Sequence, residues 1–206
     1  GPRRGRAGGA TPTPRRGRAG AGPSAGGGVF LDGRDMTLSP PAERPVTAVF
    51  QDHNTFAHLD AWQNVALGLS PVLSLDSGQR AAVDRALDLV GLASMAKRLP
   101  GDMSGGERQR IAIARVLVRK RPILLLDEAF AALGPGLRRE MLRLVKALHR
   151  SEGLTTLMVT HQPEDARHMA DSVVFVDAGV ARAPVDTAKF FASHDAQVKS
   201  YLGAWT

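Results

Sequence analysis

Four large aliphatic residues in a row, Ile123 to Leu126, run directly into two carboxylates, Asp127 and Glu128. An apolar run of this length, which starts at Pro122, is typical of a strand buried on both faces of a parallel sheet. In α/β folds, ligands bind beyond the carboxyl ends of such strands, which is where these two side chains emerge. One carboxylate there can anchor Mg²⁺ through its waters while the other orients or deprotonates a water molecule. The plainer alternative is that both cap a strand and accept turn hydrogen bonds.

A helix start precedes this strand. Ser104 is followed three residues later by Glu107, just before a stretch with helical apolar spacing, which is the pattern of a capping box. Gly105 and Gly106 let the backbone lie close to a ligand, and the N–H groups at a helix N-terminus attract anions such as phosphate. These residues are therefore candidates for a phosphate contact.

With two further segments, these motifs resemble those of the ATP-binding subunits of ABC transporters. The matching segments follow the order of the family's Q-loop, signature motif, Walker B strand and switch-histidine strand: Val49 to Asp52, Met103 to Gln109, Ile123 to Glu128 and Met158 to His161. Other segments are similar to the subunits that power bacterial thiamine import: Gly68 to Pro71, Arg98 to Gly101 and Arg121 to Glu128. The resemblance implies an α/β fold, a P-loop NTPase-like ABC nucleotide-binding domain with a helical subdomain at about residues 54–116.

The resemblance also implies a role for each site residue. ATP and Mg²⁺ would be the cofactors, with ATP held between two subunits. The signature residues would contact the nucleotide: Ser104, Gly105, Gly106 and Glu107. The catalytic residues would be Glu128, which polarises the attacking water, His161, which contacts the γ-phosphate, and Gln51, which with Asp127 would also hold Mg²⁺.

The phosphate-binding loop of such ATPases, G-x-x-x-x-G-K-[ST], is absent from the sequence. The nearest stretch, Gly22 to Gly28, has the glycines but neither the lysine nor the following hydroxyl residue, and it leads into an expected strand without room for a helix. We interpret it as linker. The ABC domain is accordingly expected over residues 29–206 without its Walker A region, which makes the fold N-terminally truncated.

Residues 1–28 differ in composition from the rest. They hold ten glycines, four prolines and six arginines and no acidic residue, so they are expected to be disordered. Their arginines account for nearly all of the net charge of +7. Such a tail can bind nucleic acid or an anionic membrane, but no aromatic is interleaved for base stacking, which favours a solvated tail. A second hypothesis is that it is an out-of-frame or misassembled stretch.

The expected partners follow from the resemblance: membrane permease subunits, a second copy of the chain and, indirectly, a periplasmic solute-binding protein, at the cytoplasmic face of the bacterial inner membrane. The surface around Phe56 and His58 resembles the groove that receives a permease helix. Two rival functions stay open. One is a degenerate, non-hydrolysing binding subunit, favoured by the missing lysine. The other is a non-transport ABC ATPase on nucleic acid, for which no coiled-coil insertion is visible.

Local patterns predict further strands, helix ends and surface residues. Strands are expected at 29–31, 46–50, 154–160 and 171–177, and a helix through Met141 and Leu148 is expected to end near Gly153. We expect Arg108, Arg110 and Arg115 to form a solvated helix face. Two positions depart from the family pattern: Ala129 replaces the usual proline, and Gly134 replaces the aspartate that helps the two ATP sites communicate. The chain has no cysteine, which suits a reducing compartment.

Overall fold

The computed structural model describes residues 27–50 and 55–203, which belong to two units that divide between Arg44 and Pro45. In the first unit, strands β1 (Phe30–Leu31) and β2 (Arg34–Asp35) form an antiparallel hairpin. The turn residues Asp32 and Gly33 have φ of 50° and 70°, the left-handed conformation that a tight two-residue hairpin loop requires. The strand predicted at 29–31 is confirmed here.

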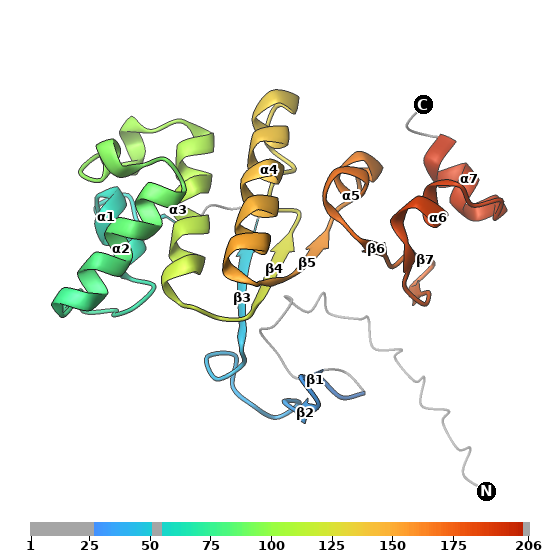
Figure 1. Cartoon of the computed structure of the whole chain (residues 1–206), viewed down its shortest axis with the longest axis horizontal. Helices are drawn as coiled ribbons and strands as arrows, with labels where there is room; N and C mark the ends of the chain where they lie inside the picture. Colours follow the sequence, from blue (N-terminus) through green and yellow to red (C-terminus); the bar gives the residue numbers. More distant parts are fainter. Residues whose placement is uncertain (1–26, 51–54, 204–206) are drawn as a thin grey trace, which may run out of the picture. The chain divides into compact units, whose positions relative to one another are not determined.

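The second unit is built on a three-stranded parallel sheet (Figure 1). Its strands are β3 (Val46–Phe50), β4 (Ile123–Asp127) and β5 (Thr155–Val159), with β4 in the centre. The last residues of the three strands, Phe50, Asp127 and Val159, are paired across the sheet, so all three strands end at one edge. This confirms the predicted strands and places the acidic pair at the carboxyl edge.

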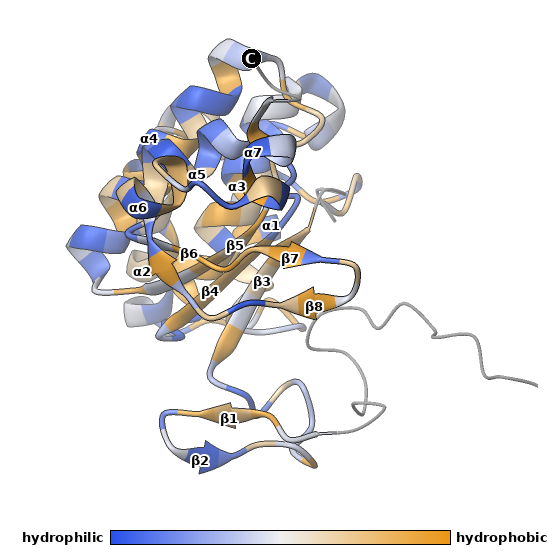
Figure 2. Ribbon diagram, turned by 90° about the vertical axis from the view of Figure 1, so that its right-hand side faces the viewer, coloured by the Kyte–Doolittle hydropathy of each residue, from blue (hydrophilic) through white to orange (hydrophobic). Residues whose placement is uncertain are grey.

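The prediction that β4 is buried on both faces is wrong. Burial alternates along the strand: Leu124 and Leu126 are 2% and 0% exposed, whereas Ile123, Leu125 and Asp127 are half-buried. On the neighbouring β5, Leu157 and Val159 are 57% and 46% exposed. Figure 2 shows these strands as hydrophobic segments. Among the described residues, the side chains on one face of the sheet are buried or half-buried in the core. The side chains on the other face are mostly apolar and partly exposed to solvent.

Three helices pack together beside the sheet: α1 (Ala61–Ala66), α2 (Ser77–Leu89) and α3 (Gly105–Val118). Short 3₁₀ turns η1 (Ala93–Met95) and η2 (Pro100–Asp102) lie between α2 and α3. Asp60 and Asp76 begin α1 and α2 with capping boxes, each completed by a glutamine three residues on. The helical character expected here is confirmed; the bounds of a separate helical subdomain stay a prediction.

The arginines of α3 do not form the solvated face that we expected. Arg108 donates to the Met103 carbonyl, Arg110 to the Val90 carbonyl and to Glu140. Arg115 donates to the main-chain and side-chain oxygens of Asn64, at 2.9 Å each. Burial lowers the pKa of Arg115. The prediction failed because a long guanidinium side chain can run along apolar surface and reach carbonyl groups that end other elements.

The remaining elements follow the sheet. Helix α4 (Pro135–Glu152) ends, as predicted, at Gly153, which has φ of 64°. Helix α5 (Pro163–Met169) follows β5. The single strand expected at 171–177 is instead two short strands, because each pairs with a different returning segment: β6 (Ser172–Val173) with β9 (Val185–Asp186), and β7 (Val176–Asp177) with β8 (Val180–Ala181).

Two short helices, α6 (Thr187–Phe191) and α7 (Ala196–Gly203), complete the described chain. Within residues 27–50 and 55–203, no helix has both the length and the apolar character that a membrane crossing requires.

Candidate functional site

The acidic pair lies where the central strand ends. Asp127 is the last residue of β4, and the Glu128 N–H donates to the Val159 carbonyl at 3.0 Å, which continues the ladder by one residue. Glu128 has φ of 47°, a left-handed conformation that costs a non-glycine residue about 1–2 kcal/mol. Backbone strain of this kind persists where the surroundings hold it, and it concentrates at functional sites.

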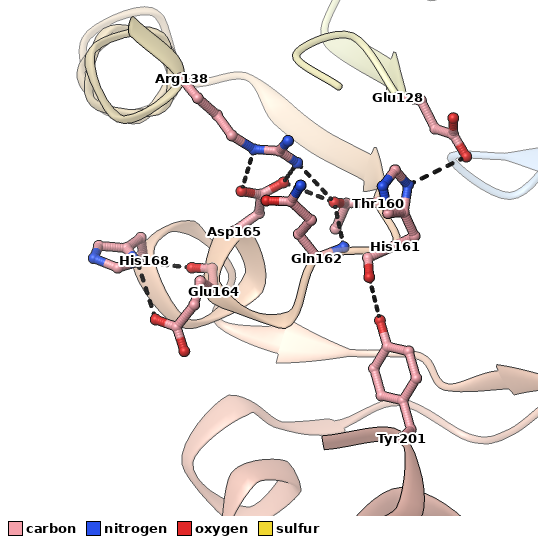
Figure 3. A network of polar contacts seen from close by, with 9 residues as sticks. All are labelled: Glu128, Arg138, Thr160, His161, Gln162, Glu164, Asp165, His168 and Tyr201. Carbon is pink, nitrogen blue, oxygen red and sulfur yellow. Dashed lines mark hydrogen bonds and ion pairs between the residues drawn. The ribbon is translucent and has the colours of Figure 1, made fainter. Parts of the chain in front are cut away.

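His161, two residues beyond β5, faces this glutamate. Its Nδ1 atom lies 3.7 Å from Oε1 of Glu128, and the two side chains are 51% and 46% exposed (Figure 3). The structure therefore brings together two residues that are far apart in sequence and to which the family resemblance gives catalytic roles. Both side chains stay accessible to a ligand at the carboxyl edge.

A buried ion pair lies behind His161. Arg138 of α4 and Asp165 of α5 have side chains only 8% and 4% exposed, and the guanidinium donates to both carboxylate oxygens, with Nε 2.8 Å from Oδ1. The Thr160 hydroxyl donates to the same carboxylate at 2.7 Å. This network fixes the residue that precedes His161 (Figure 3).

Sequence reasoning missed this network. Asp165 lies four residues after His161, and Arg138 is near the start of a helix that follows Glu128. Each of these two helices carries a charged residue on its buried side. Because buried charges are almost always paired, this pattern could have predicted that the two residues form an ion pair.

The signature segment forms the predicted capping box. The Ser104 N–H donates to Oε2 of Glu107 at 2.6 Å, and the Glu107 N–H donates to the Ser104 hydroxyl at 3.3 Å. Gly106 is buried, and a Cβ there would meet Leu137 of α4 at 2.6 Å, whereas a Cβ on Gly105 would meet nothing. A side chain at Gly106 would therefore require the Leu137 side chain to move. The nucleotide roles of these four residues stay a prediction.

The capping box gives an expectation on pH. The Ser104 backbone N–H holds the pKa of Glu107 below its ordinary value of 4.5. A carboxyl group whose pKa is lower in the folded chain than in the unfolded chain stabilises the fold at pH values above its unfolded-state pKa. This stabilisation is lost as the pH falls through the folded-state pKa. Glu107→Gln keeps the acceptor but cannot titrate, so acid should weaken α3 less in this variant than in the parent chain. Helicity followed between pH 7 and pH 3 checks this; equal acid sensitivity of the two chains would contradict it.

Mg²⁺ suits the chemistry of this edge. Asp127 offers a hard oxygen donor at the strand end, and Mg²⁺ usually takes one or two carboxylates and fills its other positions with water and phosphate oxygens. Within residues 27–50 and 55–203, no group of three or more histidine, cysteine or acidic side chains is placed to hold a metal ion. Gln51, the other expected ligand, lies outside the described residues.

The fold and this edge define a class. A parallel α/β sheet with an acidic pair at the carboxyl end of its central strand and a capped helix N-terminus nearby in sequence is typical of P-loop NTPase domains. The sequence model of the ABC transporter family matches residues 19–131, more than half of the chain. The chain belongs to the ABC transporter family. The expected fold class is thereby confirmed.

Several curated relatives are similar over most of the chain. The thiamine import ATP-binding protein ThiQ of Rhizobium meliloti (strain 1021) is 53% identical over 178 residues, 86% of this chain and 75% of the relative. The protein of the same name from Mesorhizobium japonicum is 53% identical over 179 residues, 86% of this chain and 71% of the relative. That from Brucella suis biovar 1 is 58% identical over 151 residues, 73% of this chain and 63% of the relative.

Proposed function

We propose that the chain is the ATP-binding and hydrolysing subunit of an ABC importer for thiamine. The observation that carries the proposal is the Glu128 carboxylate 3.7 Å from the His161 ring at the carboxyl edge of a parallel sheet. The substrate is supported by the printed names of relatives that are 53% and 58% identical. The capped signature helix supports a nucleotide as ligand.

In this proposal, each site residue has a defined role. Glu128 accepts a proton from the water that attacks the γ-phosphorus, and its half-exposed carboxylate leaves room for that water. His161 donates to the γ-phosphate, and Ser104, Gly105, Gly106 and Glu107 contact the nucleotide of a partner subunit. Asp127 and Gln51 would hold Mg²⁺, which when bound would neutralise phosphate charge, and Gln51 would also contact the attacking water. Catalysis would depend on positioning and electrostatics.

Hydrolysis would serve transport through other subunits. We place permease subunits, a second ATP-binding subunit and a periplasmic binding protein around the chain, at the cytoplasmic face of the inner membrane. The Phe56 side chain is 48% exposed, and its ring lies edge-on to that of His58 with the ring centroids 6.2 Å apart. These two rings offer an aromatic surface to a permease helix. Residues 1–28 would be a separate tail, and 29–206 the ATPase domain.

A second candidate is a subunit that binds the permease without hydrolysing ATP. The sequence lacks the pattern G-x-x-x-x-G-K-[ST], which favours this candidate. In that loop, the backbone amides and the lysine make most of the contacts that bind the phosphates. For the same reason, the hydrolysing form is expected to bind ATP weakly.

A transport assay separates the two candidates. The chain is produced in a bacterial strain whose own thiamine-import ATP-binding subunit has been deleted, and uptake of labelled thiamine is measured. Restored uptake that Glu128→Gln abolishes supports the proposal. Copurification with the permease without uptake supports the second candidate, and neither uptake nor copurification overturns both.

A further inference from the structure

The peptide group between His161 and Gln162 is held on both sides. Its carbonyl oxygen, on His161, accepts a hydrogen bond from the Tyr201 hydroxyl at 2.8 Å. Its N–H, on Gln162, donates to the Thr160 hydroxyl at 3.1 Å. Because a peptide group is planar and rigid, fixing both of its polar atoms fixes the backbone direction at His161 (Figure 3).

The N–H side of this peptide is anchored in the interior. The Thr160 hydroxyl that accepts from Gln162 itself donates to Asp165, and Arg138 pairs with that carboxylate from α4. The chain of contacts therefore runs from two helices to the loop that carries His161. Both charged groups are buried, which makes this side rigid.

The carbonyl side is anchored by a different part of the chain. Tyr201 lies on α7, and its ring packs against Phe175 with ring centroids 5.5 Å apart. Arg182 lies over the same Phe175 ring at 5.3 Å and pairs with Asp195, whose carboxylate accepts from the Val198 N–H in the first turn of α7. The hydroxyl of Tyr201 is thus placed by residues 172–203.

The environment of Tyr201 agrees with a defined position. Burial, and secondly the charge of Asp165, raise the pKa of its hydroxyl above the ordinary value of 10.0. The hydroxyl therefore keeps its proton at neutral pH and remains a donor to the His161 carbonyl. An ionised phenolate would have no proton to donate there.

We propose that Tyr201 is a positioning residue of the ATP site, through which the C-terminal segment 172–203 sets the orientation of His161 toward Glu128. The loop supports this: the backbone carbonyl of His161 accepts a hydrogen bond from Tyr201, while its ring is half-exposed and lies beside Glu128. Such fixed backbones under accessible side chains are what a preorganised site requires. The catalytic meaning of this positioning rests on the proposed function.

The test removes one hydroxyl and keeps the ring. The full chain is labelled at its histidines and at its backbone nitrogens and studied by NMR. Tyr201→Phe should shift the ring signals of His161. It should also speed hydrogen exchange at the Gln162 amide about tenfold, which corresponds to the free energy of about one hydrogen bond. Ser200→Ala, which deletes a hydroxyl from the neighbouring exposed position, should change neither. Urea unfolding is measured for all three chains.

The outcomes separate positioning from general support. Changes confined to His161 and its neighbours, with the unfolding midpoint nearly unchanged, support the proposal. Unchanged His161 and Gln162 signals overturn it, as does a lower midpoint with exchange faster across all of α7 and the sheet. No nucleotide is present, so the result does not depend on whether the chain hydrolyses ATP, and failure of the proposed function would be seen separately in the transport assay.

Discussion

Arg138→Met is expected to lower the free energy of unfolding by about 3–5 kcal/mol, because it leaves the Asp165 carboxylate buried without its cation. In the folded chain, the two side chains are 8% and 4% exposed and share two hydrogen bonds. The Thr160 hydroxyl would be the remaining donor to that carboxylate among the contacts described for this network. Urea denaturation at pH 7 measures the loss.

Two further variants make this expectation specific. Arg139→Met, at the next and exposed position of α4, should stay within about 0.5 kcal/mol of the parent chain. Arg138→Met combined with Asp165→Leu should lose less than Arg138→Met alone, because no unpaired charge is then buried. A loss below about 1 kcal/mol for Arg138→Met would contradict the burial of this pair.

Phe130→Ala is the second large expected effect, at about 3–5 kcal/mol of unfolding free energy. Phe130 is 1% exposed, belongs to the main hydrophobic core and lies two residues after Glu128. Deleting its ring removes apolar contacts and leaves a cavity under the loop that holds Glu128 in its left-handed conformation. Thermal or urea unfolding checks the value.

A smaller replacement at the same position provides the comparison. Phe130→Leu keeps most of the volume and should cost about 1.5 kcal/mol. If the alanine and leucine variants were equally stable, the ring would not fill the core as described. The alanine variant should also broaden the His161 ring signals, because its partner Glu128 loses its support.

Several structural features at and near the candidate site could be predicted from the sequence because they are local. The capping box at Ser104 and Glu107, the strand ending at Asp127 and the helix end at Gly153 each depend on residues a few positions apart, so pattern and chemistry were sufficient. The facing of Glu128 and His161 was not among the predictions, although both residues follow parallel strands that end at the same edge.

What the sequence did not reveal depends on contacts between distant segments. No local pattern pairs Arg138 with Asp165 or sends Tyr201 back to the His161 carbonyl, since 27 and 40 residues separate the partners. The arginines of α3 were misjudged because charge alone suggested solvent, whereas the carbonyls they bind come from other elements. The open face of the sheet was missed because an apolar run indicates a strand, not what covers it.

The most direct measurement is release of phosphate from millimolar Mg-ATP by the purified chain beside Glu128→Gln, with equilibrium binding of the nucleotide recorded for both. Glu164→Gln is the matched control, because Glu164 is an exposed glutamate on α5 that also faces a histidine, with its Oε2 3.9 Å from Nδ1 of His168. We expect weak binding of the nucleotide, with turnover that falls at least about 100-fold in Glu128→Gln and is unchanged in Glu164→Gln. Absence of phosphate release, or release that Glu128→Gln leaves intact, would contradict a hydrolytic site at this edge of the sheet.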